Sequence, residues 1–239
     1  MADELLQRLQ RFREQTFPGI RTRFQDLVRE GQHPTILFIG CSDSRLVPYM
    51  LTGTGPGELF IVRNVGAFVP PHDGSAGYHG TAAAIEFAVL NLNVAHIVVC
   101  GHSHCGGIRA LYDGAPAQAT NLAAWLELGR EAVLAVLVSP EALRRTEQRA
   151  VVLQLERLMD YPMVRERVEA DPRPYTLSWT QVPGDAHRWF LTVDWAPAPD
   201  FVAALTQAEL DKRRSFVRER VKELDALALS RGTTEGSLK

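Results

Sequence analysis

Two short apolar runs, each ending at a glycine, constrain the fold of this chain more than any other feature. The first covers residues 35–40, is rich in β-branched side chains and is followed at once by Cys41. The second covers residues 96–100 and leads through Gly101 to His102 and Cys105. Continuous apolar runs of this length are typical of strands buried on both faces of a parallel sheet. Because sites in such folds lie at the carboxyl ends of the strands, we expect these side chains to meet there.

The rest of the chain alternates between strand and helix patterns. Further strands are expected at residues 58–63, 175–181 and 187–195. Helices are expected at residues 77–92, 106–112 and, with interruptions, 122–167. Within the last range, Ser139 followed by Pro140 is typical of a helix start. The alternation predicts an α/β fold with a mostly parallel central sheet flanked by helices.

Amphipathic helical patterns also mark both ends of the chain. Apolar side chains recur at helical spacing over residues 3–29, and Pro18-Gly19 is expected to divide this helix. A second amphipathic helix is predicted at residues 208–229, after a proline-rich spacer. We therefore expect an N-terminal helical arm, a central domain and a C-terminal helical extension, at residues 1–30, 31–196 and 197–239 respectively.

Composition excludes several classes of protein. The chain has 239 residues and a formal net charge of −2, so we expect no nucleic-acid partner and no attraction to acidic membranes. No apolar run reaches the ~18 residues of a membrane span, and the charged N-terminal segment does not resemble a secretory signal. An odd count of three cysteines argues against a disulfide framework and favours a reducing, cytoplasmic location.

The two predicted strand ends offer two cysteines and one histidine to a metal ion. Three protein ligands with an open fourth position are typical of catalytic zinc, whereas structural zinc usually has four. The spacing of His102 and Cys105 is a weak signal alone, since it also fits a loop histidine beside a buried thiol. Cys41 at a second strand end strengthens the zinc interpretation. Cys100 lies inside an apolar strand and is interpreted as a core thiol.

Asp43 and Arg45 follow Cys41 at intervals of two residues. In an extended segment this spacing places all three side chains on one side, where Arg45 can hold the Asp43 carboxylate in a bidentate pair. Asp43 then stays ionised and can accept a hydrogen bond from water on the metal. Two alternatives stay open: Asp43 becomes the fourth ligand, or the pair only stabilises a turn. Candidates for a proton relay are the loop histidines His72, His79 and His104.

Residues 41–45 (CSDSR) and 100–107 (CGHSHCGG) together resemble the β-class carbonic anhydrases, most closely their plant-type branch. Similar segments occur between and after these motifs, at residues 58–66, 80–89 and 147–164. The resemblance implies one zinc ion per chain, bound by Cys41, His102 and Cys105. It also implies that Asp43 and Arg45 form the catalytic pair. It also implies a homodimer or higher homo-oligomer, with the active site at the subunit interface and the N-terminal helix on the partner.

The resemblance further implies which residues bind substrate. Gln32 matches a glutamine that the plant-type branch uses for this purpose, and an apolar pocket is implied at Phe60, Val65 and Phe87. Phe87 stands where a tyrosine is usual. Phe38 replaces a tryptophan that the other branch ties to an inhibitory bicarbonate site, so no such site is expected. After residue 170 the chain departs from the family pattern, which leaves its higher assembly open.

The function that the resemblance implies is the reversible hydration of carbon dioxide to bicarbonate and a proton by zinc-bound hydroxide. A first alternative is a carbonyl sulfide or carbon disulfide hydrolase, since such enzymes resemble this family and share its zinc ligands. A second alternative is a non-catalytic zinc- or bicarbonate-responsive interaction protein. The expected location is the cytoplasm, including a carbon-concentrating compartment within it.

Overall fold

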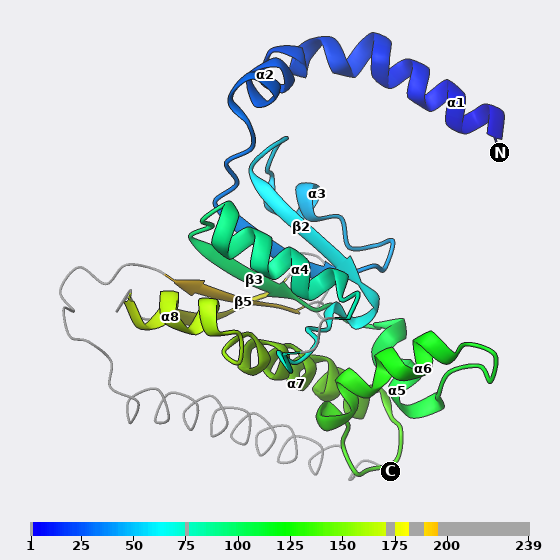
Figure 1. Cartoon of the computed structure of the whole chain (residues 1–239). Coiled ribbons are helices and arrows are strands. Elements are labelled where there is room, and N and C mark those ends of the chain that lie inside the picture. Colours follow the sequence, from blue (N-terminus) through cyan, green and yellow to red (C-terminus); the bar gives the residue numbers. More distant parts are fainter. Residues whose placement is uncertain (1, 75–76, 171–174, 182–188, 196–239) are drawn as a thin grey trace.

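A three-stranded parallel sheet forms the centre of the computed structural model, which describes residues 2–74, 77–170, 175–181 and 189–195 (Figure 1). The strands, in the spatial order β2-β1-β3, are β1 Ile36–Cys41, β2 Leu59–Asn64 and β3 His96–Cys100. Cys41 pairs with Asn64, and Gly40 pairs with Cys100. All three strands therefore end at the same edge, and the prediction of a mostly parallel sheet is confirmed.

Side chains of β1 point alternately to the two faces of the sheet, and those on one face pack against helices. Leu37 and Ile39 are fully buried in one cluster with Ile85, Val151 and Tyr161. These partners come from α4 (Gly80–Glu86), from α7 (Pro140–Leu158) and from the junction between α7 and α8 (Pro162–Ala170). Phe38, on the opposite face, packs with Leu46 and Cys100.

The remaining helices lie close to their expected positions, except that the short helix α3 was not expected. A π-helical segment, Phe87–Asn91, extends α4, while α5 covers Gly106–Asp113, α6 covers Thr120–Leu126 and α3 covers Pro48–Thr52. Ser139 caps α7, because its Oγ accepts the N–H of Ala142 at 3.1 Å with Pro140 in the first turn. The helix start that the sequence indicates there is confirmed. None of the helices in the described ranges combines the length and hydrophobicity that crossing a membrane requires.

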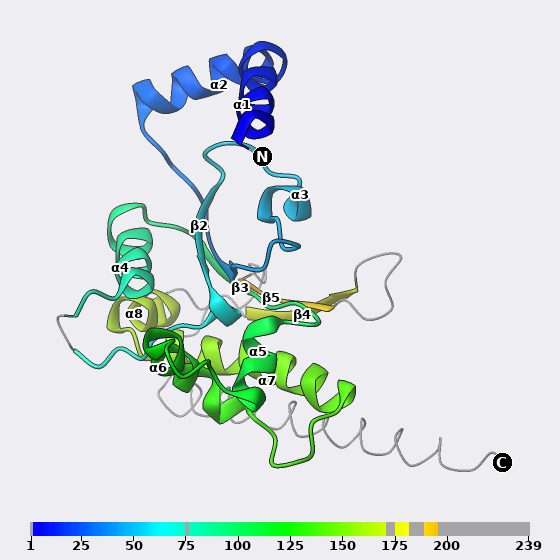
Figure 2. The same ribbon diagram turned by 90° about the vertical axis from the view of Figure 1, so that its right-hand side faces the viewer.

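A second, antiparallel sheet is formed by β4 (Tyr175–Gln181) and β5 (Trp189–Trp195), and β5 lies beside β3 (Figures 1 and 2). Both strands were expected, and residues 187 and 188, which the pattern also assigns to the second, lie outside the described residues. The predicted C-terminal helix lies outside the described residues. The division of the chain into an arm, a domain and an extension stays a prediction.

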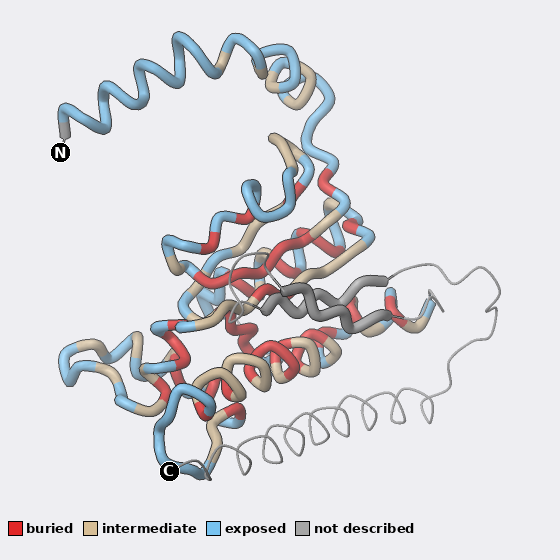
Figure 3. The backbone as a smooth tube through the Cα atoms, turned by 180° about the vertical axis from the view of Figure 1, so that it is seen from behind, coloured by how far each residue is buried: buried red, intermediate tan, exposed pale blue. Residues whose placement is uncertain are grey.

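The N-terminal arm stands away from the sheet (Figures 1 and 3). It consists of α1 (Ala2–Arg11), a π-helical turn (Phe12–Thr16) and α2 (Phe17–Glu30). Pro18 lies in the first turn of α2, directly after the π-helical turn, so the predicted division is confirmed. No described side chain of the arm is buried, and its apolar residues Leu5, Leu6 and Leu9 are more than half exposed.

Candidate metal centre

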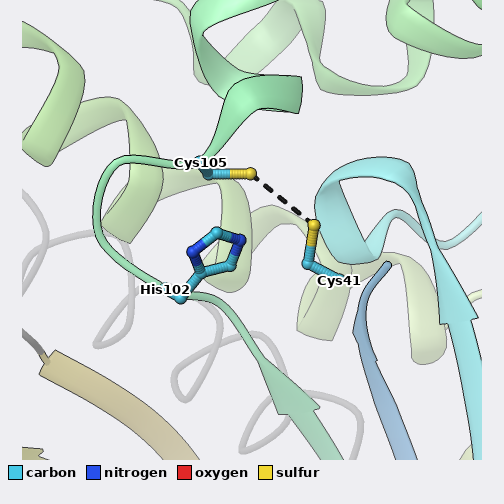
Figure 4. Close-up of side chains that lie close together, drawn as sticks. All are labelled: Cys41, His102 and Cys105. Carbon is cyan, nitrogen blue, oxygen red and sulfur yellow. Dashed lines mark hydrogen bonds between the residues drawn. The ribbon is translucent and has the colours of Figure 1, made fainter. Parts of the chain in front are cut away.

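Cys41, His102 and Cys105 meet at the carboxyl edge of the sheet (Figure 4). Cys41 is the last residue of β1, and the other two lie in the loop that leads from β3 to α5. Their candidate ligand atoms all lie within 4.8 Å of one another, and the two Sγ atoms are 3.8 Å apart. Both cysteines are buried. The parallel topology thus brings together the ligand set that the sequence indicates.

The hydrogen bonding of the His102 imidazole leaves one ring nitrogen available as a metal ligand. Its Nδ1 lies 2.9 Å from the carbonyl oxygen of Ser103, which can only accept, so Nδ1 carries the proton. Nε2 then has a free lone pair, and it is buried without a hydrogen-bond partner among the described residues. An unsatisfied buried nitrogen is destabilising unless something binds it. With two sulfurs beside it, this nitrogen fits a metal ion.

The hydrogen bond between the two thiols shifts their pKa values in opposite directions. The hydrogen bond with Cys105 lowers the pKa of Cys41, and the N–H groups of Asp43 and Gly66 assist. The same bond, together with burial, raises the pKa of Cys105. A cation between the sulfurs would favour the loss of both protons, because metal binding and thiol deprotonation are coupled.

Asp43 forms the bidentate pair with Arg45 that the spacing indicates. Nε of Arg45 donates to Oδ1 at 2.9 Å and Nη2 donates to Oδ2 at 2.7 Å. These hydrogen bonds hold the pKa of Asp43 well below its usual range, so the carboxylate is ionised. Oδ2 lies 3.8 Å from Nε2 of His102. The expectation of an extended segment is wrong, because the N–H of Leu46 donates to the Asp43 carbonyl at 3.0 Å and closes a turn.

Two supporting residues, which the sequence analysis did not single out, hold the backbone around the site. Arg63, near the end of β2, donates to the carbonyl oxygens of Cys41 at 3.0 Å and of Asp43 at 2.6 Å. Glu147 on α7 accepts the N–H of Cys105 at 3.0 Å. Burial raises the pKa of Glu147 to about 7. The position of Arg63 at a strand end was a usable hint, whereas Glu147 is 42 residues from its partner.

The expected pocket residues do not all reach the metal centre of their own chain. Val65 directly follows β2 and is 37% exposed there. Phe60 pairs with Leu37, four residues before the Cys41–Asn64 pair, which places it ~13 Å along the strand from the site. Phe87 stacks on Phe60 with ring centroids 5.7 Å apart. Gln32 is exposed and precedes β1, so it lies at the opposite end of the sheet.

Cys100 and His104 differ in how they relate to the site. Cys100 is 1% exposed, and burial raises its pKa to about 12, which confirms the interpretation as a core thiol. The side chain of His104 is exposed, and its backbone has a φ of 54°. Its carbonyl oxygen accepts Nη2 of Arg45 at 2.8 Å. The backbone of His104, rather than its ring, contacts the Asp43–Arg45 pair.

Comparison with known proteins gives consistent matches. The family model described as carbonic anhydrase matches residues 36–177. A carbonic anhydrase of Synechococcus elongatus is 37% identical over 182 residues, which are 69% of this chain and 62% of that protein. The chain therefore spans less than two thirds of the length of this relative.

Solved structures of β-carbonic anhydrases share the fold. That of CcaA superposes with a TM-score of 0.67 and 34% identity, covering 74% of this chain and 82% of the other. A solved structure of the two tetrameric β-carbonic anhydrases of Sordaria macrospora also matches, with a TM-score of 0.63 and 30% identity. The match covers 74% of this chain and 90% of the other.

Proposed function

Because this chain belongs to the β-carbonic anhydrase family, we propose that it catalyses the reversible hydration of carbon dioxide to bicarbonate and a proton. One observation carries the proposal. An ionised carboxylate, Asp43, is held by Arg45 beside a buried group of two cysteines and one histidine. Such a group can bind a zinc ion through three ligands and leave a position for water.

We propose zinc as the cofactor, with Cys41, His102 and Cys105 as its ligands. Zinc held in this way supplies Lewis acidity, which lowers the pKa of a bound water towards ~7. The two thiolates and the neutral imidazole offset the charge of the ion, so neighbouring groups matter more for that acidity. Asp43 is the nearest such group and, being ionised, it can only accept. Its role is to accept the O–H of the substrate water and to orient the oxygen towards carbon dioxide.

The role of Arg45 is to restrain Asp43. The bidentate pair fixes the carboxylate plane, and the N–H of Arg45 also donates to Oδ1 at 2.9 Å. A carboxylate restrained by three hydrogen bonds loses little further entropy when it orients a water. Without them Asp43 is free to turn towards His102 and the cysteines, which would remove the open position.

We also propose that two copies of the chain complete each active site. Gln32, Phe60 and Phe87 lie at the far end of the sheet from the metal centre of their own chain, so only a second subunit can bring equivalents to it. The exposed apolar side chains of α1 support an assembly, since such faces are usually covered. The Sordaria macrospora relatives are tetrameric. All three cysteines are free, which supports a reducing, cytoplasmic location.

The test combines the zinc content of the purified protein with stopped-flow carbon dioxide hydration between about pH 6 and 9. We expect one zinc per chain, and a fall in rate of about 10²-fold or more for Asp43→Asn. Asp113→Asn is a matched control, because it changes an Asp–Arg pair that is exposed and lies on α5. A zinc-free protein, or an Asp43→Asn variant with an unchanged hydration rate, would contradict the proposal.

Two further measurements separate the alternatives. Sulfide release from carbonyl sulfide at a rate exceeding carbon dioxide hydration would identify a hydrolase on the same ligands. Normal zinc content without hydration at any pH in the range would instead favour the non-catalytic interaction protein. Sedimentation of the intact protein measures the assembly, and a monomer with full activity would refute the shared site.

A further inference from the structure

One peptide group links Glu147 to the Asp43–Arg45 pair. The N–H of Cys105 donates to Oε1 of Glu147 at 3.0 Å. The carbonyl of the same peptide group belongs to His104 and accepts Nη2 of Arg45 at 2.8 Å. That Nη2 also donates to Oδ2 of Asp43 at 2.7 Å. A carboxylate on α7 is therefore connected to the catalytic carboxylate through one peptide and one guanidinium.

This peptide group adopts a conformation that the local sequence does not favour. His104 has a φ of 54°, in the left-handed region that few residues other than glycine occupy, although asparagine, aspartate and histidine occur there more often than the rest. Its side chain is exposed and supplies no packing. Such a conformation persists only where surrounding contacts impose it. The contacts on this peptide group are those from Glu147 and Arg45.

Of these two residues, Glu147 is the better anchored. Its neighbours on the buried side of α7 are Thr146, which is fully buried, and Ala150, which is 3% exposed. The Thr146 hydroxyl also donates to the Ala142 carbonyl at 2.8 Å within the helix. The Arg45 side chain, in contrast, is 49% exposed, and exposed ion pairs alone restrain a side chain weakly. Glu147 on α7 is therefore the residue that can position Arg45, rather than the reverse.

We propose that Glu147 is a positioning residue for the Asp43–Arg45 pair and that His104 acts through its backbone. The carboxyl oxygen that accepts at the N–H end and the positive charge that donates at the carbonyl end polarise the peptide and strengthen both hydrogen bonds. Arg45 is thereby fixed, and Asp43 stays paired instead of turning into the metal centre, whose His102 Nε2 is 3.8 Å away. The inference rests on the proposed function, since it concerns the open position that substrate water needs.

The experiment measures azide affinity in the cobalt-substituted protein by visible absorption, because azide needs the same open position as water. Glu147→Ala is expected to weaken azide binding about tenfold, as Asp43 competes for that position. Glu147→Gln retains a carbonyl acceptor and is expected to weaken it only about threefold. Glu141→Gln is the matched control on the same helix, since this glutamate pairs with Arg144 at the surface. Its azide affinity should equal that of the wild type.

A double-mutant cycle then tests the route. In an Asp43→Ala background no carboxylate is left to compete, so Glu147→Ala should no longer change azide affinity. An effect that persists in this background would overturn the proposal. A second outcome would also overturn it: Glu147→Ala loses cobalt, but the molecules that keep cobalt bind azide as the wild type does. Glu147 would then only support the loop that carries His102 and Cys105. Azide binding needs no turnover, so an inactive protein with the expected cycle would refute only the proposed function.

Substitutions of His104 give a second test that leaves α7 intact. His104→Asn removes the imidazole but tolerates a positive φ, and azide affinity should be retained. His104→Val, with a branched Cβ, resists that conformation and should weaken azide binding about tenfold. Equal affinities in the two variants, or a loss in His104→Asn, would overturn the backbone role.

Discussion

Gly107 offers a direct way to perturb the metal centre without touching a ligand. It is the second residue of α5, and it lies against the turn that follows β2. A Cβ at this position would lie 3.0 Å from the nitrogen of Gly66, 3.0 Å from Cγ1 of Val65 and 3.2 Å from Cα of Gly66. Two of these atoms are backbone, which cannot rotate out of the way. Gly107→Ala must therefore push the turn and the helix apart.

Two opposing contributions set the change that Gly107→Ala makes to the free energy of unfolding. Overpacking of this kind is destabilising by about 1–3 kcal/mol. Replacing glycine by alanine in a helix stabilises by up to about 1 kcal/mol. Gly106→Ala is the matched control, because no atom lies within 4 Å of the corresponding Cβ. The two alanine variants should then differ by about 2 kcal/mol in the free energy of unfolding, with Gly107→Ala the less stable.

The displacement should also weaken zinc binding, because the moved turn carries the Gly66 N–H that favours the Cys41 thiolate. Urea denaturation of the zinc-loaded variants measures stability, and competition with a chelator measures zinc affinity. A difference of about 2 kcal/mol lowers the urea midpoint by about 1 M. If Gly107→Ala proved as stable and as zinc-retentive as Gly106→Ala, the close approach of turn and helix would be refuted.

Two further predictions concern parts of the fold that support α7. Tyr161→Phe removes the hydroxyl that donates to the Pro70 carbonyl at 2.9 Å, and it should lower the free energy of unfolding by about 1–2 kcal/mol at neutral pH. Burial raises the pKa of Tyr161 from 10 to about 12, so its contribution is complete below pH 10 and is lost between pH 10 and 12. The stability gap between wild type and variant should therefore narrow over that range in alkaline denaturation, and a constant gap would contradict this. Ser139→Ala should destabilise by about 1 kcal/mol through the lost cap of α7, whereas Ser139→Asp, which keeps an acceptor, should not.

The meeting of Cys41, His102 and Cys105 was predictable from the sequence because it needs only local patterns and one topological rule. The apolar runs before Cys41 and His102 identify β1 and β3, and parallel strands end at a common edge. The Asp43–Arg45 pair was predictable for a different reason, since it joins residues two apart. The turn that closes it was missed because residues at intervals of two fit an extended segment as well as a turn.

The placement of the pocket residues follows from register, which the sequence alone does not give. Phe60 and Val65 are five residues apart in the chain, yet they lie at opposite ends of β2. Only the pairing of Phe60 with Leu37 shows that this side chain is remote from Cys41 in its own subunit. Motif similarity suggests pocket residues without saying which subunit supplies them, so the proposal that a second copy completes the site rests on the strand register.

Two turns with a positive φ lie at the carboxyl edge of the sheet, one held by contacts close in the sequence and the other by contacts from distant residues. After β2, Ala67 has a φ of 55°. The Asn64 side chain stabilises this turn, because it accepts the Phe68 N–H and donates to the Phe68 carbonyl, each at 2.8 Å. After β3, His104 has a φ of 54° and is held by Glu147 and Arg45. Alanine gives no sign of such a conformation in the sequence, and histidine gives only a weak one. The strain sits where the sulfurs approach one another, and side-chain hydrogen bonds balance it there.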